Sequence, residues 1–405
     1  MAKKQSPQLD TVLMHTGLAP FHPDTGAAPV ALPSMRTSTV RFRDLAAMDA
    51  MSERKRQGER AVWYGRAGMD THGALEQVFC ELEGARYAYL ASSGMAAITL
   101  ALLALLDAGD HVLVADCAYA PVRRLDKSVL SRLGIQVDYC RGHPDALAAN
   151  LTDRTRVLYV ESPGSLLMEM LDLPELARFA RQHNLVMVAD NTWGSGYIYR
   201  PLQLGAHVSV VAGTKYVAGH SDLMLGAVMV NDADLAARID ETHYAMGYSI
   251  SADDAWLALR GVRTLPLRMR ESAANGLALA QWLQKQPQVV RVFHPALPGS
   301  PGHELWRRDC TGSNGLLAIE LAMTNEQARR FVDALQLFGI GFSWGGFESL
   351  VQLVSPELLE PHSHWQGGGN PVVRLHAGLE SADDLIVDLA RALQIAQRPQ
   401  DQAND

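Results

Sequence analysis

The feature that most limits the fold of this chain is a series of short apolar segments that alternate with helical patterns. Apolar runs of the kind that form buried strands occur at 111–116, 156–163 and 185–190. The stretches 121–133 and 174–183 between them have the pattern of helices. Neighbouring parallel strands need a crossover connection of this kind, so the alternation predicts an α/β fold with a mainly parallel, doubly wound sheet.

The pattern changes twice along the 405 residues, which predicts three parts. Residues 1–60 have little periodicity and several prolines, so we expect an N-terminal arm that could pack on another subunit. Residues 61–255 contain the alternating pattern of a large domain, and 256–405 are expected to form a smaller C-terminal α/β domain. A long helical pattern joins the two, and Pro266 should break or kink it.

Composition and charge exclude several classes of protein. Apolar residues make up 48% and charged residues 20%, and the net charge of −8 without a long basic stretch argues against nucleic-acid binding. The longest apolar run, 96–106, is shorter than the ~20 residues that span a bilayer, and the N-terminus lacks the apolar core of a signal peptide. The four cysteines form no CxxC pair and no metal-binding spacing, so we expect a cytoplasmic protein without a metal site.

Lys215 is the candidate for covalent chemistry because it directly follows an apolar, strand-like run that ends in Gly213 and Thr214. The chain has six lysines, and the other five lie in polar or charged surroundings. Burial disfavours the ammonium form, lowers the pKa and frees the amine to attack a carbonyl or to hold a Schiff base. A lysine that extends into solvent from a strand end would leave the same local pattern.

Asp190 ends another apolar run, in the sequence LVMVADNTW, about one strand and one crossover before Lys215. A carboxylate in this place suits a pyridoxal phosphate site, where it keeps the ring nitrogen protonated so that the ring can accept electrons from a carbanion. An aspartate that caps the following helix would look the same. The two residues together favour the cofactor site more than either does alone.

Several further residues could bind anions or a ring. Gly94 lies in a turn of small residues before a helix, where backbone N–H groups favour a phosphate. Tyr64 and Arg66 in WYGRAG could also contact a phosphate, although a surface arginine beside a turn is commoner. Arg374 lies inside an apolar strand and needs a carboxylate, from the protein or from a substrate. Tyr119 follows a strand and could lie flat on a ring or simply pack.

Taken together, these segments resemble the Cys/Met-metabolism family of pyridoxal-phosphate enzymes, which has the aspartate-aminotransferase-like fold, fold type I. The resemblance extends from YGR at 64–66 to RLHAGLE at 374–380. The segments ESPG, DNTW, TKYVAGHSD, HPALPGSPGHELWRRDCTGSNG and SWGGFESL occur between them in family order. The resemblance implies pyridoxal 5'-phosphate as the cofactor, bound by the large domain.

Three local differences make the chain resemble the bacterial β-lyases of this family more than its γ-synthases and γ-lyases. Ser165 stands in ESPGSL where the γ-type ESPxNP has asparagine, and Ala212 stands in AGTK where SxTK has serine. Trp344 in SWGGFES replaces the leucine of LGGxES. The N-terminal arm matches the family weakly.

The resemblance assigns catalytic roles to three residues. Lys215 would hold the cofactor as a Schiff base, Asp190 would pair with the pyridine nitrogen, and Tyr119 would stack on the ring. The residues expected to bind the cofactor phosphate within the chain are Gly94, Met95 and Thr214.

The resemblance also assigns a substrate pocket and an assembly. Arg374 would bind the substrate carboxylate, while Ser343 and Trp344 would shape the pocket. Tyr64 and Arg66 would reach the phosphate of a neighbouring subunit, and Tyr64 would also contact the substrate there. We therefore expect a homotetramer, a dimer of dimers with shared active sites.

The activity that the resemblance implies is β-elimination of L-cystathionine to homocysteine, pyruvate and ammonia, one step before methionine in transsulfuration. Lys215 would remove the α-proton as a general base. Cysteine desulfhydrase, cystathionine γ-lyase and γ-replacement activities share the same lysine, aspartate and arginines, so they stay open. A lyase-like regulatory protein that binds a partner is a further alternative, which a cofactor spectrum and a pyruvate assay would distinguish.

Overall fold

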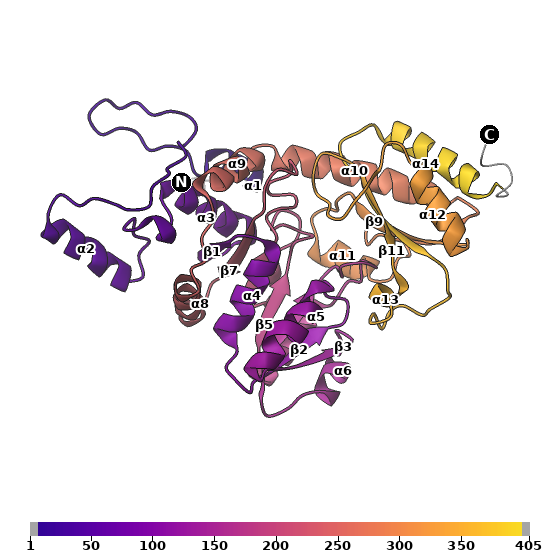
Figure 1. Cartoon of the computed structure of the whole chain (residues 1–405), viewed down its shortest axis with the longest axis horizontal. Coiled ribbons are helices and arrows are strands. Elements are labelled where there is room, and N and C mark those ends of the chain that lie inside the picture. Colours follow the sequence, from indigo (N-terminus) through magenta and orange to yellow (C-terminus); the bar gives the residue numbers. More distant parts are fainter. Residues whose placement is uncertain (1–6, 399–405) are drawn as a thin grey trace, which may run out of the picture.

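The structure is a computed structural model that describes residues 7–398. Figure 1 shows an N-terminal arm that projects from a large sheet with its helices, and a second sheet formed by the C-terminal part of the chain. The helices are α1 Leu9–His15, α2 Leu45–Arg56, α3 Asp70–Glu83, α4 Gly94–Leu105, α5 Pro121–Leu125, α6 Pro144–Ala149, α7 Leu173–Gln182, α8 Ala233–Ala245, α9 Ala252–Val262, α10 Leu265–Leu283, α11 His303–Asp309, α12 Asn325–Ala334, α13 Pro356–Leu359 and α14 Ala382–Ala396, with short helical turns η1 Gly65–Ala67, η2 Asp126–Leu130, η3 Ser131–Leu133 and η4 Pro201–Leu204.

The large sheet has seven strands in the order β1-β7-β6-β5-β4-β2-β3. The five strands from β6 to β3 are parallel, whereas β7 runs antiparallel to both of its neighbours. This confirms the expected mainly parallel, doubly wound sheet of fold type I. The strands are β1 Tyr87–Ala91, β2 His111–Ala115, β3 Gln136–Cys140, β4 Thr155–Glu161, β5 Val186–Asp190, β6 Val208–Val211 and β7 Gly226–Val230.

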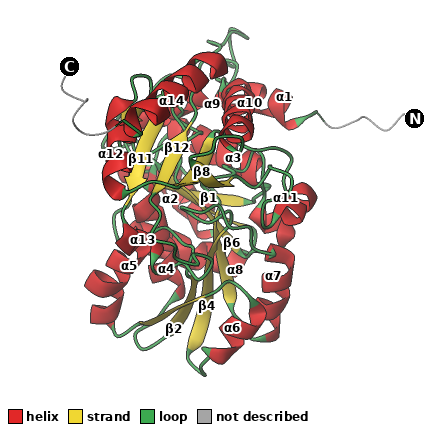
Figure 2. Ribbon diagram, turned by 90° about the vertical axis from the view of Figure 1, so that its right-hand side faces the viewer, coloured by secondary structure: helices red, strands yellow, loops and turns green. Residues whose placement is uncertain are grey.

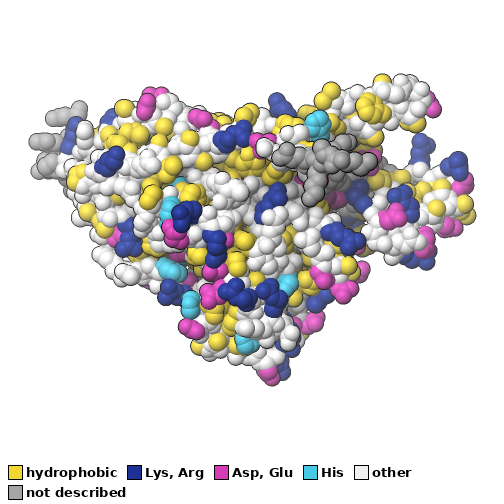
Figure 3. All heavy atoms as spheres, turned by 180° about the vertical axis from the view of Figure 1, so that it is seen from behind, with side chains coloured by type: hydrophobic (Ala, Val, Ile, Leu, Met, Phe, Trp, Pro, Cys, Tyr) yellow, Lys and Arg dark blue, Asp and Glu magenta, His cyan; other side chains and the backbone are white. Residues whose placement is uncertain are grey.

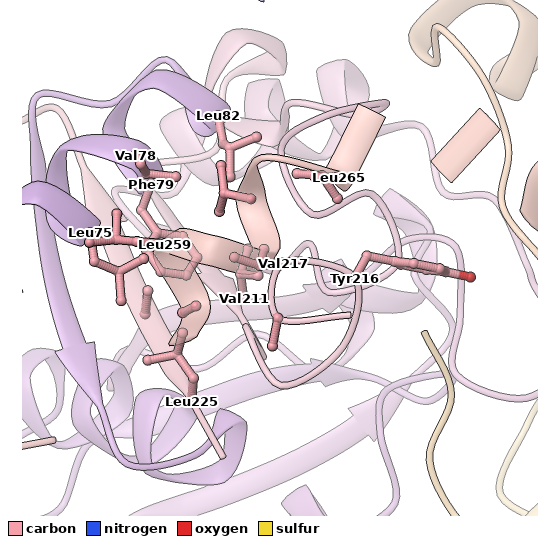
Figure 4. Close-up of a cluster of buried hydrophobic side chains, with 14 of the residues drawn as sticks. Leu75, Val78, Phe79, Leu82, Val211, Tyr216, Val217, Leu225, Leu259 and Leu265 are labelled. Atoms are coloured by element: carbon pink, nitrogen blue, oxygen red, sulfur yellow. The ribbon is translucent and has the colours of Figure 1, made fainter. Parts of the chain in front are cut away.

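Helices cover both faces of this sheet, which explains why its central strands are continuous apolar runs. Successive side chains of a strand point to opposite faces. In β2, Val112 and Val114 therefore join the apolar cluster formed with α4 and α8, whereas Leu113 and Ala115 join the cluster formed with α7. A third cluster unites α3 with α9 and with the turn that follows β6, and Figure 4 shows part of it, with Leu75, Phe79 and Leu259 close together.

The C-terminal sheet has five strands in the order β10-β11-β12-β9-β8 and is antiparallel except for β10 and β11. Helices α10, α12 and α14 pack on it in one apolar cluster, and Figure 2 shows this sheet above the large one. The expected break at Pro266 is confirmed, because α9 ends before it and α10 begins with proline in its first turn. The strands are β8 Val289–Phe293, β9 Leu316–Leu321, β10 Gly339–Ile340, β11 Leu350–Val354 and β12 Val372–His376.

The N-terminal arm contains more helix than its sequence pattern predicts. Helix α1 is anchored by Leu13, which is fully buried in the cluster around α3. Helix α2 buries none of its residues within this chain and projects from the molecule in Figure 1, so it has no apolar stripe that a periodicity argument could detect. The predicted limits of the arm and of the two domains stay predictions.

The surface is charged and mixed. On the face shown in Figure 3, basic and acidic side chains are interspersed rather than gathered by sign. Within residues 7–398, every helix is too short or too polar to cross a membrane.

The docking of α1 gives a test of the arm. Replacing Leu13 with alanine leaves a cavity in a fully buried position, so we expect the free energy of unfolding to fall by ~2–5 kcal/mol and α1 to lose hydrogen-exchange protection. Met14 on the same helix is 36% exposed, and Met14→Ala should change neither quantity measurably. Equal effects of the two substitutions would contradict this packing of α1.

Candidate active site

Lys215 lies in the turn that follows β6, at the carboxyl edge of the large sheet. Its Nζ donates a hydrogen bond to Ser343 Oγ at 2.6 Å and lies 5.4 Å from the centre of the Trp344 ring. Burial lowers the pKa of the Lys215 amine to about 8, the nearby Arg374 charge adds to this, and Asp190 opposes it. Near neutral pH the amine is still mainly protonated, but its unprotonated fraction is far larger than that of an ordinary lysine, as a nucleophile or general base requires.

Asp190 is the last residue of β5, in the next strand of the sheet. Thr192 donates to its Oδ1 from both the backbone N–H, at 2.9 Å, and the hydroxyl, at 2.6 Å, and Tyr159 donates to its Oδ2 at 3.1 Å. Burial raises the pKa of Asp190, although these donors and Lys215 act in the opposite direction. A carboxylate this deeply buried is stabilised by a cationic partner, and a protonated ring nitrogen would supply one.

A second carboxylate and Tyr119 complete this edge. Glu161 ends β4, and the strand register pairs it with Asp190. Its Oε2 accepts a hydrogen bond from the backbone N–H of Tyr119 at 2.6 Å. Burial and the Glu161 charge raise the pKa of the Tyr119 hydroxyl, which therefore stays protonated at neutral pH. The carboxyl ends of neighbouring parallel strands meet at one edge, where open α/β sheets bind ligands.

The first turn of α4 faces the turn that holds Lys215. Ser93 caps the helix by accepting from the Ala96 N–H at 3.1 Å, and the next residues, Gly94 and Met95, have helix N-terminal N–H groups without an intrahelical acceptor. A Cβ added at Gly94 would lie 2.5 Å from the Cβ of Ala212, so only glycine permits this close approach. The place suits a phosphate group.

The Thr214 hydroxyl, which was expected to bind the cofactor phosphate, forms hydrogen bonds within the protein. Its hydroxyl donates to the carbonyl of Leu225 at 3.0 Å and accepts from the N–H of the same residue at 2.8 Å. The hydroxyl proton is thus already used to fix the Lys215 turn to the strand that follows. A contact between Thr214 and the cofactor phosphate stays a prediction.

Arg374 projects from β12 of the C-terminal sheet and is 8% exposed. Its Nη2 donates to the Ser343 carbonyl at 3.4 Å, and among residues 7–398 no carboxylate pairs with it. Burial lowers the pKa of the guanidinium to about 10, so Arg374 remains charged at neutral pH. A buried, charged arginine without an acidic partner is suited to bind the carboxylate of an incoming ligand.

Ser343 and Trp344 lie on a loop of the C-terminal domain that reaches over the Lys215 turn. Ser343 has a φ of +87°, a conformation that residues other than glycine rarely adopt. The Trp344 ring packs against Tyr216 with a centroid separation of 5.6 Å. The structure thus brings Lys215, Ser343, Trp344 and Arg374 together, although they come from both domains.

Tyr64 and Arg66 do not join this group within one chain. Tyr64 is 40% exposed, and both residues line a separate surface cavity of about 390 Å³. Arg66 stacks on the Tyr244 ring at 4.2 Å and donates to the Tyr244 carbonyl at 2.7 Å. Their predicted roles at the site of a neighbouring subunit stay predictions.

The residues present fit pyridoxal phosphate. The chain offers an amine with a lowered pKa, a buried carboxylate that lacks a cation, and a glycine-lined helix N-terminus on one sheet edge. Sequence reasoning missed three residues of this site: Tyr159, Glu161 and Thr192. Thr192 could have been found, because an aspartate often accepts from the residue two positions later. Glu161 ends an apolar strand just as Asp190 does, which is a similar signal.

The chain is similar to known proteins over nearly its whole length. Residues 10–394 match the family model described as Cys/Met metabolism PLP-dependent enzyme. The chain is 62% identical over 393 residues to the cystathionine beta-lyase of Bordetella avium, covering 97% of this chain and 99% of the relative. It is 38% identical over 390 residues to the cystathionine beta-lyase MetC of Escherichia coli K12, covering 94% and 97%.

A solved structure shares the fold over nearly the whole length. The crystal structure of cystathionine gamma synthase from Xanthomonas oryzae pv. oryzae, in complex with aminoacrylate and cysteine, superposes with a TM-score of 0.87. The two sequences are 30% identical, and the match covers 97% of this chain and 99% of the other.

The close approach at Gly94 predicts how this chain holds the phosphate. Gly94→Ala should weaken cofactor binding on the order of tenfold or more, because the added methyl group overpacks against Ala212 and displaces the first turn of α4. The measurement is a titration of the cofactor-free protein with pyridoxal phosphate, followed by absorbance. The double variant Gly94→Ala/Ala212→Gly removes the closest contact and leaves the Cα of residue 212 at 3.2 Å, so it should recover part of the affinity. A double variant as weak as the single one would refute this reason for glycine.

Proposed function

Because this chain belongs to the Cys/Met metabolism PLP-dependent enzyme family, we propose that it is a carbon–sulfur lyase that cleaves L-cystathionine at the Cβ–S bond. The products are homocysteine, pyruvate and ammonia. The observation that carries the proposal is the double use of Ser343, whose Oγ accepts from Lys215 while its carbonyl accepts from Arg374. One residue thereby fixes the base and the carboxylate-binding group of an amino-acid site relative to each other.

Different residues of the chain have different roles in the reaction. Arg374 binds the α-carboxylate and orients the amino acid. The Lys215 amine, with its pKa lowered to about 8, removes the α-proton. When bound, the cofactor would supply an electron sink for the charge left on the α-carbon, and Asp190 would be the anionic partner of its ring nitrogen. The protonated Lys215 can return its proton to the sulfur as the Cβ–S bond breaks, and the three-carbon remainder takes up water to give pyruvate and ammonia.

Trp344 supports cleavage at Cβ rather than Cγ. Its indole is half-buried against Tyr216, directly beside the Lys215 amine. A rigid ring in this place limits how far the substrate chain can bend, which keeps the second proton transfer needed for γ-elimination away from the lysine. The high identity to a named cystathionine beta-lyase points the same way.

The assembly belongs to the same proposal. Tyr64 and Arg66 lie outside the Lys215 cluster but have the residue types that bind a phosphate, with Arg66 held in place by Tyr244. We place them in the active site of a second subunit, within a homotetramer built as a dimer of dimers. The four cysteines, all free, fit a cytoplasmic enzyme.

Product analysis tests the reaction. With L-cystathionine, the wild-type enzyme should release pyruvate and homocysteine, with little 2-oxobutanoate and cysteine, and Lys215→Ala should release neither keto acid. Trp344→Leu should raise the share of 2-oxobutanoate by an amount that corresponds to about 1–3 kcal/mol, the usual size of a packing effect on specificity. Mainly 2-oxobutanoate from the wild type would contradict the β-lyase assignment and leave the family unaffected.

Subunit complementation tests the shared site. Arg66→Ala and Lys215→Ala should each be inactive, and a mixed dimer has one site in which both residues are intact. Mixing the two proteins under conditions of subunit exchange should therefore restore part of the pyruvate production. A mass measurement can follow subunit exchange independently. The control is the protein in which both subunits carry Lys215→Ala, because none of its sites has the lysine. Proven exchange without recovered activity would exclude a contribution of Arg66 to the neighbouring site.

A further inference from the structure

His376 is a buried residue of the C-terminal sheet that the proposed mechanism does not use. It is the last residue of β12, is 1% exposed, and lies two positions after Arg374 on the same face of the strand. Its Nε2 accepts a hydrogen bond from the Gly345 N–H at 3.0 Å, so Nδ1 carries the ring proton and donates to the Glu348 carbonyl at 3.1 Å. Both ring nitrogens are therefore occupied by the backbone of one loop.

This loop carries the parts of the site that touch the base. It begins at Ser343, whose hydroxyl contacts Lys215 and whose φ of +87° needs support from its surroundings. At Gly345 the loop lies so close to the Lys215 turn that an added Cβ would be 3.0 Å from Tyr216 N. His376 ties the loop at Gly345 and at Glu348, directly after this strained part.

Ring packing extends the same support to Trp344. The His376 ring lies 5.9 Å from the Tyr216 ring, and Tyr216 lies 5.6 Å from Trp344. The Tyr216 hydroxyl accepts from the Gly315 N–H at 3.2 Å, which fixes the middle ring of the three. The indole orientation thus depends on the loop, which His376 holds, and on Tyr216, which His376 contacts.

We propose that His376 is a positioning residue that sets the orientation of Ser343 and Trp344 relative to Lys215, and thereby the choice of the bond that is broken. This inference rests on the proposed lyase function and deepens it. His376 acts through the loop and does not exchange protons during the reaction, because both of its nitrogens are engaged. Burial also lowers its pKa to about 4, so the ring is neutral at working pH.

Three substitutions at this position separate the alternatives. His376→Leu keeps a buried apolar volume but loses both hydrogen bonds to the loop. His376→Asn can replace only the Nδ1 contact with the Glu348 carbonyl, because its shorter amide lies near the position of Nδ1. The longer amide of His376→Gln can place its oxygen near the position of Nε2 and accept from the Gly345 N–H, the contact next to Trp344, without an ionisable group.

The first readout is catalysis of L-cystathionine cleavage. His376→Leu and His376→Asn should lower kcat on the order of 100-fold, since a misplaced base costs about this much. KM should change much less, because Arg374 stays on β12. Both variants should also release a larger share of 2-oxobutanoate than the wild type. His376→Gln should retain the wild-type product ratio.

The second readout needs no cofactor. In the cofactor-free protein, the pH dependence of Lys215 modification by an amine-selective reagent, measured by mass spectrometry of its peptide, reports the pKa of the amine. The wild type should give about 8. A loosened loop admits water to Lys215, so this pKa should rise in His376→Leu and His376→Asn and stay low in His376→Gln. Arg374 and Asp190, the charged groups that act on Lys215, are unchanged in all three variants.

The control is His207, a half-buried histidine at the opposite edge of the large sheet. Its Nδ1 accepts from the Met187 N–H at 2.8 Å, so His207→Leu also removes a histidine–backbone contact, but far from the loop. It should lower stability without a change in product ratio or in the pKa of Lys215.

The outcomes distinguish this inference from the function on which it rests. Folded His376→Leu or His376→Asn with wild-type products and an unchanged Lys215 pKa would overturn the inference. Loss of activity in His376→Gln as large as in His376→Leu would overturn it too, because restoring the contact with Gly345 would then not restore the site. Neither result affects the lyase assignment, which depends on the products of the wild type alone.

Discussion

The site depends on the burial of one ammonium group at the carboxyl edge of a parallel sheet. Removing Lys215 from water lowers its pKa to about 8 and makes the amine available as a base, but a buried amine also needs a partner. That partner, Ser343, comes from the C-terminal domain. The cluster therefore needs both the turn that follows β6 and the loop that precedes β11, which come from distant parts of the chain.

Two of the residues discussed above, Arg374 and His376, come from one strand of the C-terminal sheet. Arg374 and His376 project from the same face of β12, the first toward an incoming carboxylate and the second into the backbone of the Ser343 loop. A strand in the middle of a sheet moves less than a loop, so both the substrate anchor and the support of the loop share one fixed frame. The strained Ser343 can persist because the loop residues that follow it, Gly345 and Glu348, are held by His376.

The sequence predicted the parts of the site that are local and missed those that depend on register. Lys215 and Asp190 stand at the ends of apolar runs, which a single sequence shows directly. Tyr159 and Glu161 reach the site only because β4 lies beside β5 with Glu161 opposite Asp190, and strand order is not a local property. Helix α2 was missed because it buries nothing within this chain, and one chain cannot reveal what Tyr64 and Arg66 touch in another.

Specificity within such a site is set by much smaller energies than catalysis. In the proposed mechanism, elimination at Cβ and elimination at Cγ begin with removal of the same α-proton by the same amine, from a substrate held by the same arginine. The family resemblance in Lys215, Asp190 and Arg374 therefore does not indicate which bond breaks. The difference lies in how far the substrate chain can bend toward Lys215 for a second proton transfer, and packing differences of about 1–3 kcal/mol decide such questions. In the proposed function the Trp344 indole acts at this level, and it can do so only if its orientation is fixed more firmly than the substrate it restrains. On a mobile loop the indole would rotate away when the substrate chain pressed against it. The contacts that fix the orientation of Trp344 therefore matter as much as its size.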